Sequence, residues 1–506
     1  MGQSTSEPFT TGLSLNHCMS AGGRTLNNMS DTLYHIRTSE KIAIGDVSKM
    51  FWRFSTPPKT WSLNRFFHKR GGLGSQDDWE EAACCTADFG ATGAPSLANC
   101  GMYQCVIDHI SSDDPQLAEE ISKKRYMDDV FLVDRWEADI HPKIEKTERG
   151  LAKGGLTIKE WLVSGEGSPD DRYEIGDLPG GESEEKCLGF TYLPKADKIG
   201  LKARLNPSRR IRGRRTKPDL VPGKVRERFQ EEGLCKREIL TMEMQIFDIT
   251  GLAAPLVMRA RMAYREVLVS QDGIGWDDQL SDQNKEIWIQ LVEELLKLEG
   301  ESWDRSVVPT DHDGSPAWLV LFADGGDGAA MAAAYLRFRR KDGSYVANLI
   351  SAKGKINSLR HLTIPRVELH AHLMMVRMAD HLRGVVNVKI GRVVFLGDST
   401  AIQQQIGKRS ILFDNWVAPR VEEIQQKASI DDFYLVAGVD NPADFGTKLT
   451  GKPVTVEDVK SHKWLHGGFI DQEFENWPVT RVQPGGELPG LKTKFKDLSI
   501  TTANNI

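Results

Sequence analysis

Cysteine is sparse in this sequence. Its seven cysteines all lie in the first half of the chain and include no Cys-x-x-Cys pair, which excludes a disulfide framework and a cysteine zinc site. No apolar run reaches the roughly 18 to 20 residues that cross a bilayer. The polar N-terminus also lacks the charged-then-apolar pattern of a signal peptide. We therefore expect an intracellular protein, cytoplasmic or nuclear, with no membrane partner.

Proline and glycine are not in excess, at 22 and 46 of 506 residues, and 40% of the chain is hydrophobic. This composition excludes collagen, low complexity and wholesale disorder. The net charge of −6 gives no sign of a polyanion partner, but total charge averages over patches of opposite sign. At about 150 residues per domain, the length favours about three domains, each large enough to bury a core.

The pattern of elements changes twice along the chain. Short β-type runs, such as 41–47, alternate with helical stretches up to about residue 200, and helical patterns dominate from residue 235 to 300. Beyond residue 311, three strands in succession are followed by alternating helices and strands. This predicts an α/β and α+β multidomain protein whose last domain has a mixed sheet. The predicted parts are 1–200, 201–310 and 311–475, followed by a tail, 476–506, that is expected to be disordered.

Two adjacent acids, Asp128 and Asp129, follow Tyr126 and Met127 and lead into the apolar run 130–133. Neighbouring carboxylates repel each other and are costly to desolvate, so a hairpin that keeps both near its apex usually has a cation to offset them. A plain surface turn is the alternative, and for an isolated Asp-Asp pair it is the commoner explanation.

A third acid, Asp46, ends another apolar strand. Three carboxylates brought together from a strand end and a hairpin apex could hold two hard cations about 3.5 to 4 Å apart, as in phosphoryl transfer. A turn of small residues, which includes Gly90 and ends at Pro95, lies between these acids in the sequence. There the backbone could approach a nucleotide or template closely.

Four further acids occur at the ends of predicted elements in the last domain. Asp324 and Asp398 each follow an apolar strand. Glu368 lies in the first turn of a helix predicted to begin at Pro365, and Asp444 lies just inside another, predicted to open with Asn441 as its cap and Pro442 as its first residue. Each acid alone has an ordinary structural explanation, because carboxylates favour first helical turns and the turns that follow strands.

The ordered set resembles the palm of a reverse transcriptase of the BEL/Pao family of long-terminal-repeat retrotransposons. Asp46 and Phe51 match motif A, 89–95 match motif B and 126–129 match motif C. The resemblance continues through 154–161, 187–190, 236–240 and 247–252.

The resemblance implies that Asp46, Asp128 and Asp129 bind two Mg²⁺ ions, for which Mn²⁺ can substitute. It also implies that Phe51 lies under the sugar of the incoming deoxynucleotide as a gate against a 2′-hydroxyl. The other residues expected to contact substrate are Tyr126, Met127, Gly90 and Pro95.

From about residue 316 to 449 the chain is similar to the ribonuclease H fold in its BEL/Pao version. The resemblance implies that Asp324, Glu368, Asp398 and Asp444 bind two Mg²⁺ ions that activate water to cut the RNA strand of an RNA–DNA hybrid. Residues 201–310 would form a helical thumb or connection. The expected partners are therefore an RNA template, a DNA primer, an RNA–DNA hybrid and deoxynucleoside triphosphates.

In the family, a fingers region precedes motif A, and only 13–23 resemble its last part. We therefore expect the ribonuclease H activity to be intact more readily than the RNA-directed DNA polymerase activity. The alternative hypothesis is a catalytically silent relic, or a nucleic-acid-binding protein adopted by its host.

Residues 202–217 contain eight basic residues and no acidic one. Such a run is typical of a solvated loop, but unopposed cations are also what contact with a phosphate backbone requires. Both explanations stay open. The residues predicted to bind nucleic acid are Arg209, Arg210, Arg212, Arg214 and Arg215.

Overall fold

The computed structural model describes most of the chain. The described residues are 14–23, 25–72, 76, 78–168, 173–174, 190–208, 210–211, 214–215, 217–270, 273–358, 362–448, 454–481, 488 and 490–491. Arg209 and Arg212 lie outside them, and for Arg210 and Arg214 the backbone is described but the side chain is not. In the described part, no helix is both long and apolar enough to span a membrane.

An antiparallel N-terminal sheet with the strand order β4-β5-β1-β6 carries the first acids. Residues alternate across β1, so Ile42 and Ile44 enter one hydrophobic core while Ala43 and Val47 enter another. The second core is completed by α3, α4 and α5. The bounds are β1 Lys41–Val47, β4 Arg125–Tyr126, β5 Asp129–Asp134, β6 Ile158–Val163, α3 Ala94–His109, α4 Pro115–Lys123 and α5 His141–Lys153.

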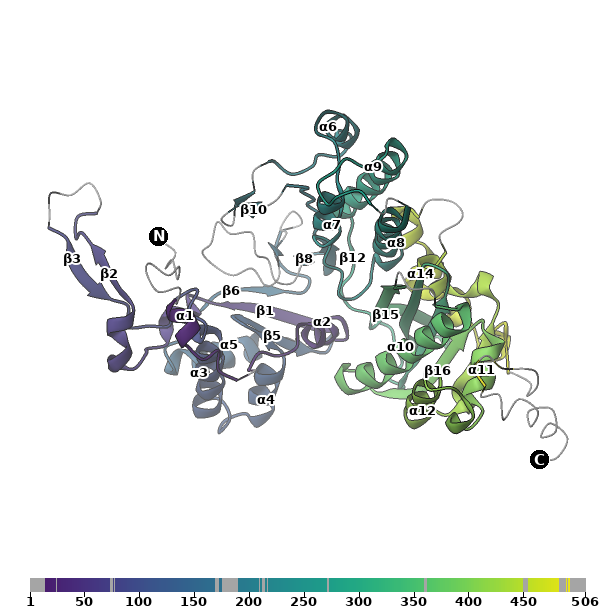
Figure 1. Cartoon of the computed structure of the whole chain (residues 1–506). Helices are drawn as coiled ribbons and strands as arrows, with labels where there is room; N and C mark the ends of the chain where they lie inside the picture. Colours follow the sequence, from purple (N-terminus) through teal and green to yellow (C-terminus); the bar gives the residue numbers. More distant parts are fainter. Residues whose placement is uncertain are drawn as a thin grey trace.

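Smaller elements surround this sheet. The strands β2 and β3 form a hairpin that projects from the N-terminal part at the far left of Figure 1. The helix α2 lies on the opposite side, next to the C-terminal part of the chain. The bounds are α1 Leu15–Cys18, α2 Met29–Arg37, η1 Met50–Arg53, η2 Pro58–Leu63, β2 Arg65–His68 and β3 Glu80–Ala83.

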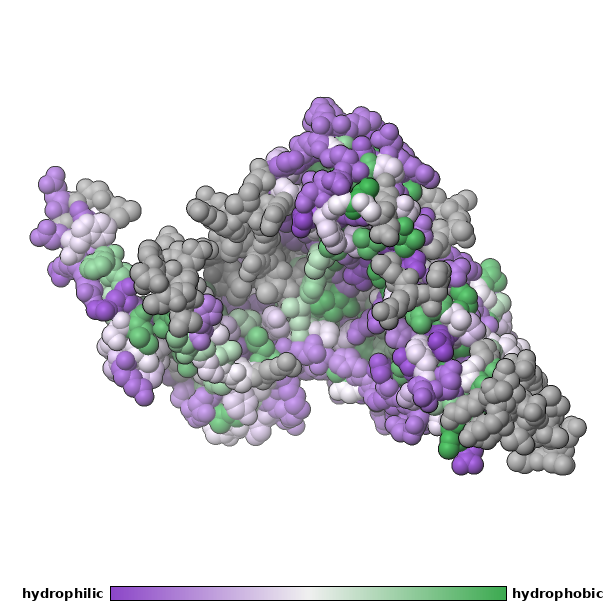
Figure 2. All heavy atoms as spheres, in the orientation of Figure 1, coloured by the Kyte–Doolittle hydropathy of each residue, from purple (hydrophilic) through white to green (hydrophobic). Residues whose placement is uncertain are grey.

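The helical region that follows rests on a second sheet, with the order β12-β9-β8-β7. Its helices bury Phe229 and Trp288, whereas hydrophilic side chains gather on its outer surface at the top of Figure 2. The bounds are β7 Tyr173–Glu174, β8 Phe190–Leu193, β9 Lys198–Leu201, β10 Arg210–Ile211, β11 Arg214–Arg215, α6 Val225–Glu232, α7 Lys236–Glu243, α8 Ala254–Ser270, α9 Asp282–Lys297, η3 Leu298–Gly300 and β12 Trp303–Asp304.

A six-stranded C-terminal sheet has the order β15-β14-β13-β16-β17-β18. The first three strands are antiparallel in succession, and β16 and β17 then add in parallel, which confirms the predicted mixed sheet. The bounds are β13 Ala317–Gly325, β14 Ala329–Arg339, β15 Tyr345–Ile356, α10 Ile364–Val385, β16 Ile390–Gly397, α11 Thr400–Ile406, α12 Ala418–Lys427, β17 Phe433–Val436, η7 Pro442–Gly446, α13 Val456–Val459, α14 His462–His466 and β18 Val479–Thr480.

Two expectations about the C-terminal sheet need correction. The helix predicted after Asn441 is the short 3₁₀ turn η7. The tail predicted to be disordered from residue 476 begins with ordered chain, because Val479–Thr480 pairs with β17 and Trp477 is buried. Clustered aromatic residues account for this order, since the Trp477 ring packs edge-on against Phe474.

One hydrophobic core joins the three parts. It runs from Leu33 and Ile42 in the N-terminal part, through Trp288 in the helical region, to Tyr335 and Trp464 in the C-terminal part. The Trp464 indole N–H also donates a hydrogen bond to the Leu252 carbonyl at 2.7 Å. The predicted multidomain mixed α/β fold is confirmed, while the domain boundaries stay a prediction.

A buried arginine ties the link between α2 and β1 to the rest of the chain. Arg305 is 0% exposed and pairs with Asp197 through two hydrogen bonds of 2.7 and 2.8 Å. Its remaining N–H groups donate to the backbone carbonyls of Ile36, Ser39 and Glu40. All five donors of the guanidinium are therefore satisfied without water.

Candidate active sites

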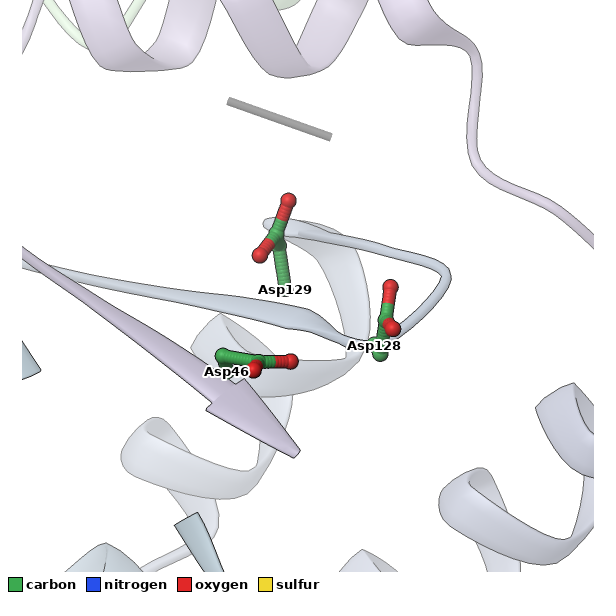
Figure 3. Close-up of side chains that lie close together, drawn as sticks. All are labelled: Asp46, Asp128 and Asp129. Atoms are coloured by element: carbon green, nitrogen blue, oxygen red, sulfur yellow. The ribbon is translucent and has the colours of Figure 1, made fainter. Parts of the chain in front are cut away.

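The three N-terminal acids meet where β1 and the β4–β5 hairpin lie side by side. Asp46 and Asp129 are direct partners in the β1–β5 register, and the Val47 N–H donates to the Asp128 carbonyl at 2.9 Å. Met127, at the hairpin apex, has a left-handed φ of 52°, which a non-glycine residue rarely adopts. Figure 3 shows the Asp46 carboxylate pointing toward Asp128, with Asp129 beside them.

Burial destabilises the charged form of two of these acids. Asp128 is only 3% exposed, and burial raises its pKa to about 7, with a further contribution from the charge of Asp46. Burial likewise raises the pKa of Asp46. Within the described residues, one carboxylate oxygen of Asp128 is buried and has no hydrogen-bond partner. An unpartnered acidic oxygen beside two more carboxylates has the electrostatic character of a cation site.

The donor set fits a hard divalent cation. One carboxylate oxygen from each of Asp46, Asp128 and Asp129 can be chosen so that all lie within 4.8 Å of one another. Oxygen-only ligands of this kind suit Mg²⁺ or Mn²⁺ rather than zinc, which favours nitrogen and sulfur.

Phe51 and Ala91 of the small-residue turn belong to the same hydrophobic core as Val47 and Val130, which follow Asp46 and Asp129 in the chain. Phe51 is buried in η1, and its ring packs against that of Phe89 at a centroid distance of 5.0 Å. Gly90 has a left-handed φ of 90°, and its carbonyl accepts a 2.7 Å hydrogen bond from the Asn16 side chain. Pro95 lies in the first turn of α3, where its missing N–H is not needed.

Sequence reasoning missed two residues that fix this neighbourhood. Asn16 also accepts the Thr92 N–H at 3.0 Å, so it binds both sides of the turn. Arg125, which precedes Tyr126, donates to the Asn99 side chain at 2.6 Å and thereby joins the hairpin to α3. The only sequence signal for Asn16 was its place in the short segment that resembles fingers.

The second set of acids converges at one end of the C-terminal sheet. Asp324 lies within β13 rather than after it, Asp398 directly follows β16, and Asp444 lies in η7. One oxygen from each lies within 4.8 Å of the others. Glu368 lies just beyond the first turn of α10. The helix begins at Ile364, one residue earlier than predicted, and its first turn holds no acid.

Burial and mutual repulsion perturb this set. Asp324 is 7% exposed, and burial raises its pKa to about 6, with repulsion from Asp398 and Asp444 acting in the same direction. Burial also raises the pKa of Asp398 and of Glu368. Lys448 forms an ion pair with Asp444, yet the other Asp444 oxygen is buried without a hydrogen-bond partner among the described residues. This donor set therefore also fits a hard cation.

Hydrogen bonds from uncharged side chains hold the elements of this site in place. The Ser399 hydroxyl donates to Glu368 at 2.6 Å, and the Thr447 hydroxyl donates to Asp324. The fully buried Asn441 donates to the Ala323 carbonyl at 3.0 Å and so fixes η7 beside β13. Sequence reasoning gave none of these three residues an orienting role, because their partners are far away along the chain.

A glycine lets α10 approach β13 closely. A Cβ at Gly325 would lie 2.5 Å from the backbone nitrogen of Glu368, which is closer than real Cβ contacts allow. The acid on the helix therefore reaches the sheet only because position 325 has no side chain. The fully buried His372, one turn after Glu368, uses its Nδ1 to bond the Glu368 carbonyl at 2.9 Å.

The described part of the basic run forms the short hairpin β10–β11. Arg215 forms an ion pair with Asp219 at 2.8 Å. The predicted contact of this run with nucleic acid stays a prediction, since most of its arginine side chains lie outside the described residues.

Residues 235–399 match the family model of the Pao retrotransposon-like RNaseH-like domain. The predicted relationship to the BEL/Pao retrotransposons is confirmed. The matched segment runs from the N-cap of α7 to the N-cap of α11. It therefore includes Asp324, Glu368 and Asp398 and ends before Asp444. The BEL/Pao resemblance of the first 234 residues therefore rests on the motifs alone.

No curated protein sequence matches the chain. Among solved structures, the chain is similar to a foamy viral protease-reverse transcriptase in complex with an RNA/DNA hybrid, at 12% identity and a TM-score of 0.45. The similarity covers 88% of this chain and 49% of the viral one, so the chain spans about half the length of that protein.

Proposed function

We propose that this BEL/Pao-related chain cleaves the RNA strand of an RNA–DNA hybrid at the acids of the C-terminal sheet. The observation that carries the proposal is the convergence of Asp324, Asp398 and Asp444 from three separate elements, with Glu368 on α10 beside them. Three of these acids lie within the matched RNaseH-like segment. Carboxylates that gather on a protein surface without a function are solvated, whereas one oxygen of Asp444 is buried and has no hydrogen-bond partner among the described residues.

Magnesium ions at this cluster would activate water and stabilise the charge that develops on the scissile phosphate. The protein itself supplies a preorganised set of acceptors. Ser399 holds the Glu368 carboxylate and Thr447 holds that of Asp324, so neither must reorient when a cation or substrate arrives. Burial raises the pKa of Asp324 to about 6 and also raises that of Asp398, so a bound cation would compete with protons at Asp324 as the pH falls toward 6.

We also propose that Asp46, Asp128 and Asp129 support addition of deoxynucleotides to a DNA primer on an RNA template. The specific support is that the β1–β5 register and the left-handed backbone at the hairpin apex bring these three acids within reach of one cation. As the family resemblance implies, Phe51 would limit the space for a 2′-hydroxyl on the incoming nucleotide.

The test is a labelled RNA–DNA hybrid with a recessed DNA primer 3′ end, incubated with Mg²⁺, with RNA cleavage and primer extension followed together. Asp324→Asn and Asp398→Asn should abolish cleavage and leave any extension unchanged. Asp128→Asn should abolish extension and leave cleavage unchanged. Asp327→Asn is the matched control, since Asp327 is an exposed acid in the turn after β13.

Cleavage that survives in Asp324→Asn and Asp398→Asn would refute the nuclease assignment. If the wild-type protein binds the hybrid but neither cuts nor extends it, the result would favour the alternative of a silent nucleic-acid-binding protein.

A further inference from the structure

A basic pocket of about 410 Å³ lies between the helical region and the C-terminal sheet, away from the two acid clusters. It forms where α8 meets the edge strand β15 and the helix α10. Its basic lining residues come from all three elements: Arg261 from α8, Lys353 and Lys355 from β15, and His370 and Arg377 from α10.

The carboxylate in the pocket lining is already engaged. Asp248 accepts backbone N–H groups from three successive residues, 251–253, at 2.8 to 2.9 Å. Two of the pocket's cations also have partners outside its lining, since Arg261 pairs with Glu243 and Arg377 with Glu423. These contacts position the side chains around the pocket and leave its interior without a free acid.

Among the described residues, the two lysines of β15 have no such ion pair, unlike Arg261 and Arg377. Lys353 and Lys355 are exposed and lie on the same face of the strand, because residues two apart alternate together. Neither has an ion-pair partner in the part of the chain that the structure describes. The neighbouring His370 experiences this charge: burial lowers its pKa, and Lys355, Arg420 and Arg377 lower it further.

The pocket lies level with the catalytic acid of β13. Asp324 pairs with Met331 on β14, and Met331 pairs in turn with Gly354 on β15, between the two lysines. Two strand spacings separate Asp324 from Gly354, or about 10 Å. Lys353 and Lys355 alternate with Gly354, so they point to the opposite face of the strand from Gly354, and they line the pocket together with residues of α10, the helix that carries Glu368. The major groove of a B-form duplex alone is about 12 Å wide, so one duplex can reach both places.

We propose that the pocket binds a backbone phosphate of the same duplex that is cleaved at the C-terminal acids. The proposal rests on the proposed function, which supplies the duplex. An anionic phosphate oxygen would complete the interaction of Lys353 and Lys355, whose positive charges have no counterpart within the described protein. A phosphate can also come from a free nucleotide, and the experiment separates the two sources.

The experiment measures hybrid affinity as a function of salt in Ca²⁺, which permits binding to be followed without turnover. The double variant Lys353→Gln/Lys355→Gln should flatten the slope of log K against log salt by about 1 to 2, as expected for one or two lost phosphate contacts. In Mg²⁺ the same variant should raise KM for cleavage and leave kcat unchanged.

Two controls make this result specific. Lys341→Gln/Lys389→Gln removes the same charge from exposed lysines elsewhere on the C-terminal part and should leave the slope unchanged. Lys353→Arg/Lys355→Arg keeps the charge and should retain the wild-type slope.

An unchanged slope in the glutamine variant would overturn the proposal, as would an equal loss in the Lys341/Lys389 control. Competition by free tripolyphosphate that disappears in the glutamine variant, with hybrid affinity unaltered, would assign the pocket to a free phosphate ligand instead. Absence of cleavage by the wild type, with the expected change of slope, would count only against the proposed hydrolysis.

Discussion

Replacing Asp324 with asparagine should make the protein more stable while it removes ribonuclease activity. The carboxylate is buried, has two acidic neighbours, and is held by the Thr447 hydroxyl. Asparagine has nearly the same shape and retains an acceptor for Thr447, but it has no charge to desolvate. Without a bound cation, the native aspartate is therefore an electrostatic burden on the fold.

The size of this burden follows from the pKa of Asp324. The difference between 3.8 for an exposed aspartate and about 6 in the fold corresponds to about 3 kcal/mol at pH 7.5. Because the folded pKa is the higher one, the native state binds more protons between these values, and the cost grows as pH rises from about 4 to about 6. A weaker bond to Thr447 offsets about 1 kcal/mol, which leaves a net gain of about 2 kcal/mol.

The assay is thermal and urea unfolding of the wild type and Asp324→Asn at pH 4 and pH 7.5, with and without Mg²⁺. For a cooperative unit of 150 to 250 residues, about 2 kcal/mol raises Tm by about 4 to 8 °C. We expect that rise at pH 7.5 without Mg²⁺ and almost none at pH 4. Mg²⁺ at ten times its Kd should add about 1.4 kcal/mol to the wild type alone.

The reasoning would be refuted if Asp324→Asn were no more stable than the wild type at pH 7.5 without Mg²⁺. It would equally be refuted if Mg²⁺ stabilised both proteins by the same amount. Asp327→Asn, which changes an exposed residue in the turn after β13, should have the stability of the wild type both without and with Mg²⁺.

Three further predictions concern the residues that build the C-terminal site and its junction. Gly325→Ala should reduce cleavage at least about tenfold, measured by initial rates, because the added Cβ meets the Glu368 backbone at 2.5 Å. Ser399→Ala should move the acid limb of the pH–rate profile to higher pH, because the hydrogen bond from Ser399 lowers the pKa of Glu368 and its removal raises that pKa. Arg305→Leu should lower the free energy of unfolding by about 3 to 5 kcal/mol, measured in urea, because it leaves the buried partners of Arg305 unpaired.

Two of these predictions have matched controls. Gly384→Ala adds a Cβ to open space near the end of α10 and should leave cleavage unchanged. Arg339→Leu removes an exposed arginine and should change stability little. A normal rate in Gly325→Ala, an unmoved pH profile in Ser399→Ala, or equal stability losses in Arg305→Leu and Arg339→Leu would each contradict the corresponding argument.

Local patterns predicted most strands and helices, because alternation and apolar runs act over a few residues. The predicted strand 41–47 has the observed bounds of β1, and the C-terminal order of three strands followed by alternating elements is as expected. The start of α10 lies one residue before the predicted Pro365, and this places Glu368 outside the first turn. The Asn441–Pro442 pair predicts the first turn of a helix around Asp444. A capping residue followed by proline suits a 3₁₀ turn as well, and the 3₁₀ turn is what forms there.

Long-range pairing could not be predicted from the sequence. The register that sets Asp46 against Asp129 depends on two strands 83 positions apart, and no local pattern encodes it. The partners of Asn441 and Thr447 lie 118 and 123 positions away. That the acids meet is a property of the fold, whereas their roles in catalysis stay a prediction.

The Arg305 junction also has a consequence during synthesis of the chain. The Ile36 carbonyl accepts a hydrogen bond from the Arg305 guanidinium, and the two residues are 269 positions apart in the chain. At about 5 to 20 residues per second, roughly 13 to 54 s pass between the emergence of the two groups from the ribosome. Throughout that interval the carbonyls of residues 36–40, at the end of α2 and in the link to β1, lack this partner, so chaperones that bind nascent chains have a defined window and segment on which to act.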